Sequence, residues 1–150
     1  MNSTPTVDDM MLAYSQDALD YAAQFGVTLD YSEASIEQVE ALLAGLYECR
    51  PKGFWAKLFN PGPTPDEFDQ LTKMLGGYVG EVMKRTWGGH WELGAGPAAG
   101  QKAITLVFAR GGKVWPHFKV GKRLLNGPED NVWHYFQALR ERQMGSHAGV

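Results

Sequence analysis

Five side chains in the second half of the chain could transfer protons or bind ions, and these are Glu81, His90, Glu92, His117 and Lys119. Enzymes use carboxylates, imidazoles and amines as general acids and bases when such groups converge on one substrate. His90 and Glu92 are two residues apart, so on a strand they would share a face and could supply two metal ligands. A third ligand at a supporting spacing is missing, and we predict neither a metal site nor a cofactor.

Nucleophilic catalysis has little support in the sequence. Cys49 is the single cysteine, which excludes an intrachain disulfide and a zinc or iron–sulfur site built from cysteines alone. We expect Cys49 to be buried as a small apolar residue. Ser35 is accounted for as a helix cap, and the other serines occupy no nucleophile elbow. We therefore predict no catalytic residues, and a small enzyme built from the five side chains above is the alternative.

Trp115, His117 and Lys119 suggest partner binding instead, because aromatic side chains are enriched at the centres of protein interfaces. Segment 50–63 is a second candidate: its prolines and glycines indicate a flexible loop, and its aromatic residues include Trp55 and Phe59. We expect these two side chains to join the partner surface. A peripheral membrane contact through the loop is an alternative, but one or two helical turns offer little apolar area.

Length and composition indicate one globular domain over residues 1–150, with 44% hydrophobic and 21% charged residues. The net charge of −3 gives no basic excess, so we expect no nucleic-acid partner. The N-terminal residues lack the basic and apolar regions of a secretory signal, and the apolar run 103–109 is too short to span a membrane. We expect a cytoplasmic protein with an ordered core over residues 6–143 and a frayed tail over residues 144–150.

Helix signals dominate the first half. An apolar stripe at steps of three and four runs from Val7 to Phe25 behind a Thr6 cap. Ser35-Ile36-Glu37-Gln38 has the form of a capping box that starts a second helix. Thr64-Pro65-Asp66-Glu67 predicts a third helix, with Thr64 as N-cap and Pro65 at the first helical position. Gly88-Gly89 is expected to end that helix.

The third predicted helix contains Gly76, Gly77 and Gly80. Each glycine costs about 0.5–1 kcal/mol relative to alanine in a helix interior. The spacing predicts that another backbone approaches the Gly76/Gly80 face, with the helix packed on a sheet. Glu81 follows directly, and we expect this carboxylate to pair with Lys119, Lys122 or Arg123.

The second half predicts an antiparallel meander of strands at 90–93, 103–109 and 114–120, followed by a C-terminal helix. A Gly111-Gly112 hairpin would place Phe108 opposite Trp115 and Leu106 opposite His117. The face expected in the core holds Thr105, Val107, Val114, Pro116, Phe118 and Val120. The face expected to be partly covered or open to a partner holds Ile104, Leu106, Phe108, Trp115, His117 and Lys119. The fold class is α+β: N-terminal helices, then an antiparallel β-meander and a C-terminal helix packed on one face.

Three motifs carry a resemblance to known sequences. These are Leu29-Asp30-Tyr31-Ser32 with Ser35-Ile36 and Leu42-Leu43; Leu75-Gly76-Gly77-Tyr78-Val79-Gly80-Glu81-Val82 with Gly88-Gly89 and Trp91; and Pro116, Lys119-Val120, Lys122-Arg123-Leu124, Asn126-Gly127 and Glu129-Asp130. From about Leu29 to Leu139 the chain resembles a group of small uncharacterised bacterial domains of unknown function. The resemblance implies no known reaction. Some bacterial domains of this build are immunity or accessory proteins, and we expect a non-catalytic protein-binding module of that kind.

Overall fold

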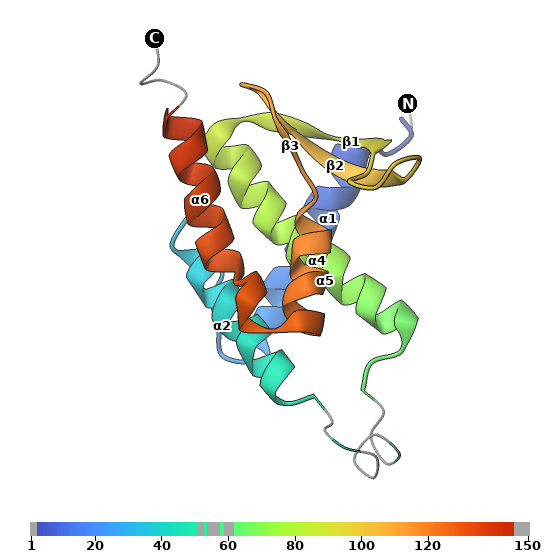
Figure 1. Cartoon of the computed structure of the whole chain (residues 1–150), viewed down its shortest axis with the longest axis vertical. Helices are drawn as coiled ribbons and strands as arrows, with labels where there is room; N and C mark the ends of the chain where they lie inside the picture. Colours follow the sequence, from blue (N-terminus) through green and yellow to red (C-terminus); the bar gives the residue numbers. More distant parts are fainter. Residues whose placement is uncertain (1–2, 51–52, 54–57, 59–61, 146–150) are drawn as a thin grey trace.

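The computed structural model describes residues 3–50, 53, 58 and 62–145, which form an α+β fold (Figure 1). Its helices are α1 (Val7–Ala23), α2 (Ser35–Glu48), α4 (Pro65–Trp87), α5 (Pro116–Asn126) and α6 (Val132–Gly145), with a 3₁₀ turn at Pro128–Asp130. An antiparallel sheet has the order β1 (Gly89–Ala95), β2 (Lys102–Phe108) and β3 (Lys113–Val114). The predicted order of N-terminal helices, sheet and C-terminal helix is confirmed.

Two of the three predicted helix starts are confirmed in detail. The Thr6 hydroxyl accepts a hydrogen bond from the Asp9 amide, and the Asp9 carboxylate accepts one from the Thr6 amide, which makes a capping box. Thr64 caps α4 with Pro65 in the first turn. The prediction for Ser35 is wrong: Ala34 is the N-cap of α2, and the Ser35 hydroxyl bonds to the Tyr78 hydroxyl at 2.7 Å.

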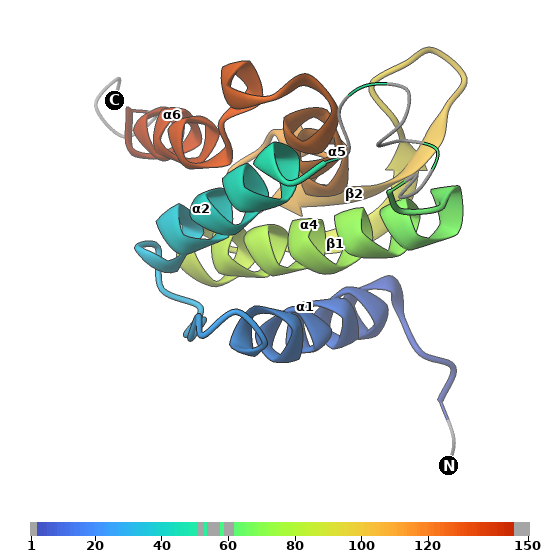
Figure 2. The ribbon, with the colours of Figure 1, turned by 90° about the horizontal axis from the view of Figure 1, so that it is seen from below.

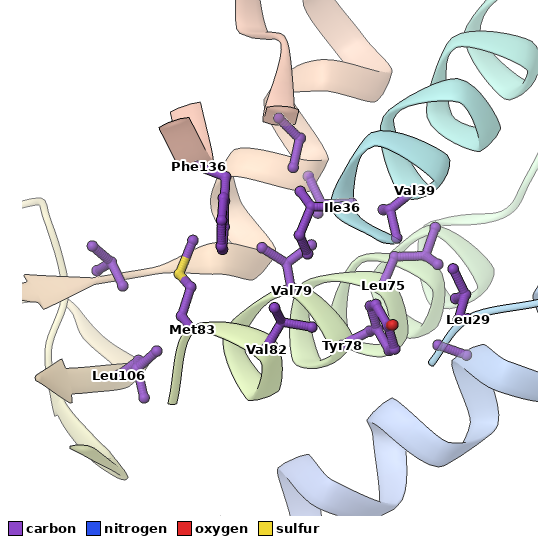
Figure 3. Close-up of a cluster of buried hydrophobic side chains, with 14 of the residues drawn as sticks. Leu29, Ile36, Val39, Leu75, Tyr78, Val79, Val82, Met83, Leu106 and Phe136 are labelled. Atoms are coloured by element: carbon purple, nitrogen blue, oxygen red, sulfur yellow. The ribbon is translucent and has the colours of Figure 1, made fainter. Parts of the chain in front are cut away.

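Helix α4 is the centre of the molecule (Figure 2). Helix α1 packs along one side of it, and α2, α5 and α6 lie on the opposite side. Apolar side chains from all these elements form one core around α4. The close-up in Figure 3 shows Ile36 and Val39 of α2 and Phe136 of α6 beside the buried side chains of α4. The largest fully buried side chains are Tyr78, Phe136, Met11, Ile36, Leu43, Leu75, Met83, Leu106, Val39, Val79, Val82 and Val120. One continuous core therefore fixes the position of every long helix.

The predicted third strand is wrong beyond Val114. Strand β3 ends there, and Pro116 begins helix α5 rather than continuing the sheet. Proline is well suited to the first position of a helix, because its fixed φ matches the helix and its missing N–H would be unpaired there. The residues from Pro116 to Val120 thus belong to a helix.

The hairpin register also differs from the prediction. Val114 pairs with Leu106, and Lys113 pairs with Val107, because the loop spans Ala109–Gly112. The observed pairing is shifted by three residues from the predicted one, and an odd shift moves the residues of β2 to the opposite face relative to those of β3. Leu106 and Phe108, predicted on the partly covered or open face, are buried together with Val114, and Val107, predicted in the core, is only half-buried.

The C-terminal helix α6 reaches the sheet through aromatic rings. Phe136 stacks on Trp87 at a centroid distance of 5.0 Å, and Trp87 meets the edge of Phe108 at 5.7 Å. Val132, Phe136 and Leu139 are buried together, as their spacing predicted. Helix α6 otherwise packs on α2 and α5. Trp87 is the last residue of α4, so the ring stack connects α6 to β2 through α4.

Candidate functional site

Helices α4 and α5 pack most closely at one end of their shared interface. A Cβ added to Gly76 would lie 2.6 Å from the His117 amide nitrogen, so the two backbones are in direct contact there. A Cβ added to Gly80 would overlap the Trp91 indole and come within 3.3 Å of Pro116 Cγ. The predicted approach of another backbone is confirmed at Gly76, but that backbone belongs to helix α5 and not to a sheet. At Gly80 the close atoms are side-chain atoms of Trp91 and Pro116.

The same two helices diverge at the other end. A Cβ added to Gly121 would lie 3.6 Å from Thr72 Cγ2 and 3.8 Å from the Phe68 ring, which is ordinary van der Waals distance. Between the diverging ends lies a groove of about 780 Å³, which we call the α4–α5 groove. It is lined by Pro65, Phe68, Asp69, Thr72, Pro97, Gln101, Trp115, His117, Phe118, Lys119, Gly121, Lys122, Leu125 and Tyr135. The pair of helices forms a wedge: the two backbones touch at the closed end, Gly76, whereas at the open end, buried Gly121, the side chains of Thr72 and Phe68 lie between them.

Three of the predicted partner-binding residues, Trp115, His117 and Lys119, line this groove together. The other two, Trp55 and Phe59, lie outside the described residues. Trp115 is half-buried, and its indole N–H donates to the Thr105 hydroxyl at 3.0 Å. The prediction placed Trp115, His117 and Lys119 on one face of the sheet. In the structure, His117 and Lys119 lie in the first turns of α5, and Trp115 is the residue before this helix.

His117 forms the inner wall of the groove and is only 8% exposed. Its ring packs 4.2 Å from the Phe118 ring between centroids. Among the described residues neither ring nitrogen has a hydrogen-bond partner, and only Nδ1 is sealed from solvent. Burial, reinforced by the positive charge of Lys73, lowers the pKa of His117 to about 4. The imidazole is therefore neutral at pH 7.

Two charges in the groove are neutralised by neighbours. Lys119 Nζ donates to Asp130 Oδ1 at 3.0 Å, and both side chains are largely buried. Asp69 pairs with Lys73 one helical turn later at 2.7 Å. Lys122 is exposed on the α5 wall. The pKa of Asp130 is lowered mainly by the hydrogen bond from Asn126 and then by Lys119, and the charge of Lys122 makes a smaller contribution in the same direction.

On the side away from the groove, α5 is held by a buried ion pair. Arg123 is 3% exposed, and its Nε donates to both carboxylate oxygens of Glu40 on α2 at 3.0 Å. The same carboxylate accepts the Val132 amide at the start of α6. This contact ties α5 to α2 and α6 at the end where α5 leaves α4. This ion pair accounts for the divergence of α5 from α4, because it anchors the diverging end of α5 to α2 and not to α4.

The five residues of the enzyme hypothesis lie in three separate places. Glu81 is buried and accepts the Trp91 indole N–H at 2.9 Å, with Lys84 Nζ 4.0 Å away. The prediction that Glu81 pairs with Lys119, Lys122 or Arg123 is therefore wrong, since α5 presents those residues elsewhere. His90 and Glu92 are exposed on β1, 3.3 Å apart. Only His117 and Lys119 share the groove. Within the part of the chain that the structure describes, no three potential metal ligands cluster.

A second groove of about 660 Å³ runs along α2 and the turn after α1. Its lining has no charged side chain and consists of Phe25, Gly26, Val27, Thr28, Gln38, Ala41, Leu42, Gly45, Leu46 and Cys49. Cys49 is exposed at its edge, so the expectation of a buried cysteine is wrong. The residue follows the last helical position of α2, where the helix has already left the core.

Comparison with known proteins adds no relative. No family model matches the chain, and the searches of curated proteins and of solved structures likewise return no match. Among the described helices, none is both long and apolar enough to cross a membrane. The resemblance to uncharacterised bacterial domains stays a prediction.

Sequence reasoning missed the α4 wall of the groove. Neither Phe68 of α4 nor Tyr135 of α6 is among the binding residues predicted from the sequence. Both are half-buried and line the groove. A usable signal was Gly76, since a helix position without a side chain can admit the backbone of a second helix, which here is α5.

Proposed function

We propose that this chain is a non-catalytic protein-binding module whose α4–α5 groove takes a segment of a partner protein. The observation that carries the proposal is the groove itself: it brings Trp115, His117 and Lys119 together beside apolar walls. Binding pockets typically have volumes of about 300–1,000 Å³ and combine apolar walls with a few polar groups. Aromatic side chains in such a setting are frequent anchors of protein interfaces.

We propose a module without catalytic activity because of the ion pairs and protonation states of the titratable groups in the groove. Lys119 and Asp69 are each held by an ion pair, and neutral His117 has no partner that would orient it as a base. The hydroxyl of Tyr135 stays protonated, because burial raises the pKa of this residue to about 12. These groups can recognise a bound segment but are poorly placed to transform it.

An immunity or accessory protein of the bacterial cytoplasm is the form of this function that we propose. Such a protein acts by occupancy: a partner held at one segment is blocked or kept in place without a chemical step. The fixed walls of the groove suit this role, because the backbone contact at Gly76 and the Glu40–Arg123 pair hold α5 in place. A preorganised groove loses less entropy on binding than a mobile one.

A pull-down from the native cytosol tests the proposal with two matched glycine variants. Gly121→Leu places a side chain in the α4–α5 groove, and Gly45→Leu places the same side chain in the α2 groove, where a Cβ meets no atom within 4 Å. We expect a protein that is retained by the wild type and by Gly45→Leu and is lost with Gly121→Leu. Equal retention by all three chains, or no retained protein, would overturn the proposal.

A further inference from the structure

The α4–α5 groove carries a charge opposite to that of the chain as a whole. The full chain has a net charge of −3. Within the groove, Asp69 is neutralised by Lys73 and Lys119 by Asp130, which leaves the positive charge of Lys122 on the exposed part of the α5 wall. Charge complementarity between surfaces selects partners and speeds their encounter. The groove is thus a positive site on an acidic protein.

The imidazole of His117 is a second polar group on the α5 wall of the groove. Its side chain is 8% exposed and lacks a hydrogen-bond partner among the described residues. Because Nδ1 is sealed, Nε2 is the nitrogen that can meet a bound acceptor.

The floor of the groove beside these groups is apolar. Phe68 and Thr72 of α4 face Gly121 of α5, and Phe118 and Leu125 extend the apolar lining. An apolar side chain of a partner can pack on Phe118 and on Leu125, which is 64% exposed. Lys122 lies between these two residues on the same helix. A ligand that fits has an apolar side chain and a carboxylate close to each other.

From this arrangement we infer that the partner segment is acidic: an apolar side chain packs on Phe118 and Leu125, and a neighbouring Asp or Glu side chain pairs with Lys122. The inference rests on the proposed function and adds the chemistry of the partner to it. The His117 imidazole then donates to or accepts from the backbone of the same segment.

A library of short random peptides displayed on phage tests the inference, with the random segment placed internally so that it has no free C-terminus. The full-length chain is the bait, and the bound peptides are measured against Gly121→Leu, Lys122→Glu and Lys113→Glu. Lys113 is exposed on β3 outside the groove lining, so its variant is the matched charge reversal. We expect selected peptides rich in Asp and Glu that bind about tenfold more weakly to Lys122→Glu and unchanged to Lys113→Glu. Selection on Lys122→Glu should instead enrich Lys and Arg.

The outcomes separate the two proposals. Peptides that are lost with Gly121→Leu but lack acidic residues, or bind Lys122→Glu as well as the wild type, would overturn the acidic segment and keep the binding groove. Peptides that bind Gly121→Leu as tightly as the wild type, or a selection without enrichment, would overturn both. Circular dichroism of each variant verifies that it is folded, so a loss of binding reports on the groove.

Discussion

Gly76 on α4 and Gly121 on α5 belong to the same helix pair but stand at its two ends, and a side chain would have opposite consequences there. At Gly76 an added Cβ meets the backbone of His117. At Gly121 an added Cβ meets only side-chain atoms of Thr72 and Phe68, at 3.6 Å or more. A side chain is excluded at Gly76 by the facing backbone, whereas at buried Gly121 a methyl group fits at ordinary contact distance. Glycines of one interface can therefore differ in whether the packing requires them.

The difference between the two ends follows from what else holds α5. At the closed end α5 is packed on α4 itself, through Pro116 and His117. At the open end it is held by Arg123, which pairs with Glu40 on a different helix. A helix anchored to two neighbours at its two ends cannot lie flush with either along its whole length. The α4–α5 groove is the space that results.

The largest expected effect comes from removing the anchor of the open end. Glu40→Gln leaves Arg123 buried without a counter-charge, and we expect the free energy of unfolding to fall by about 3–5 kcal/mol. Urea denaturation at pH 7 measures this loss. Arg140→Gln is the control, because its ion pair with Glu33 is exposed and such pairs contribute about 0–1 kcal/mol. A loss for Glu40→Gln no larger than the control would mean that another contact holds α5 away from α4.

The next largest loss of stability is expected from adding a side chain at the closed end, where α4 and α5 already touch. Gly76→Ala forces a methyl group against the His117 backbone, and we expect a loss of about 3 kcal/mol, because the backbone cannot move aside. The midpoint and slope of urea unfolding give the value. Wild-type stability in Gly76→Ala would show that the two helices are further apart in solution than in the structure.

The buried imidazole of His117, at the closed end of the wedge, predicts that the free energy of unfolding depends on pH. The pKa of His117 is about 4 in the folded chain, mainly because of burial, and lies below its unfolded value of 6.5. The unfolded chain therefore binds this proton first, and the stabilising contribution is present above pH 6.5 and is lost as the pH falls toward 4. Between about pH 7 and pH 4.5 we expect a loss of about 2 kcal/mol from this group.

The difference between the wild type and His117→Gln isolates that contribution. As the pH decreases, the free energy of unfolding of the wild type should fall toward that of His117→Gln. The difference between the two free energies should decrease by about 2 kcal/mol between about pH 7 and about pH 4.5. His134→Gln removes an exposed imidazole from α6 and is the matched control. A gap that stays constant over this range would contradict the burial of His117.

The smallest expected effect is a gain in stability at the open end. Gly121→Ala adds a methyl group at ordinary contact distance and improves helix propensity, so we expect a gain of about 0.5–1 kcal/mol. Gly45→Ala, at an open position of α2, should gain a similar amount and gives the scale. Thermal unfolding resolves such a difference. A loss for Gly121→Ala comparable with that of Gly76→Ala would mean that the groove is closed in solution.

Local signals in the sequence predicted the long helices well. Thr6 and Thr64 cap helices because a side-chain oxygen can satisfy free amides within three residues. The sequence failed where two local signals compete, as at Pro116, which can end a strand at the sheet edge or begin a helix. The apolar alternation from Val114 to Val120 is short, and periodicity over so few residues does not separate a strand from a helix.

Local signals were sufficient to predict the α+β class, the starts of α1 and α4, and the approach of another backbone at Gly76, because capping and the conformational cost of glycine act over a few residues. Only the tertiary structure decided that α5 is the approaching element and that Trp115, His117 and Lys119 line one groove with Phe68 and Tyr135. These residues come from helices far apart in the chain. Their meeting depends on how the core and the Glu40–Arg123 pair orient α5, which no local pattern encodes.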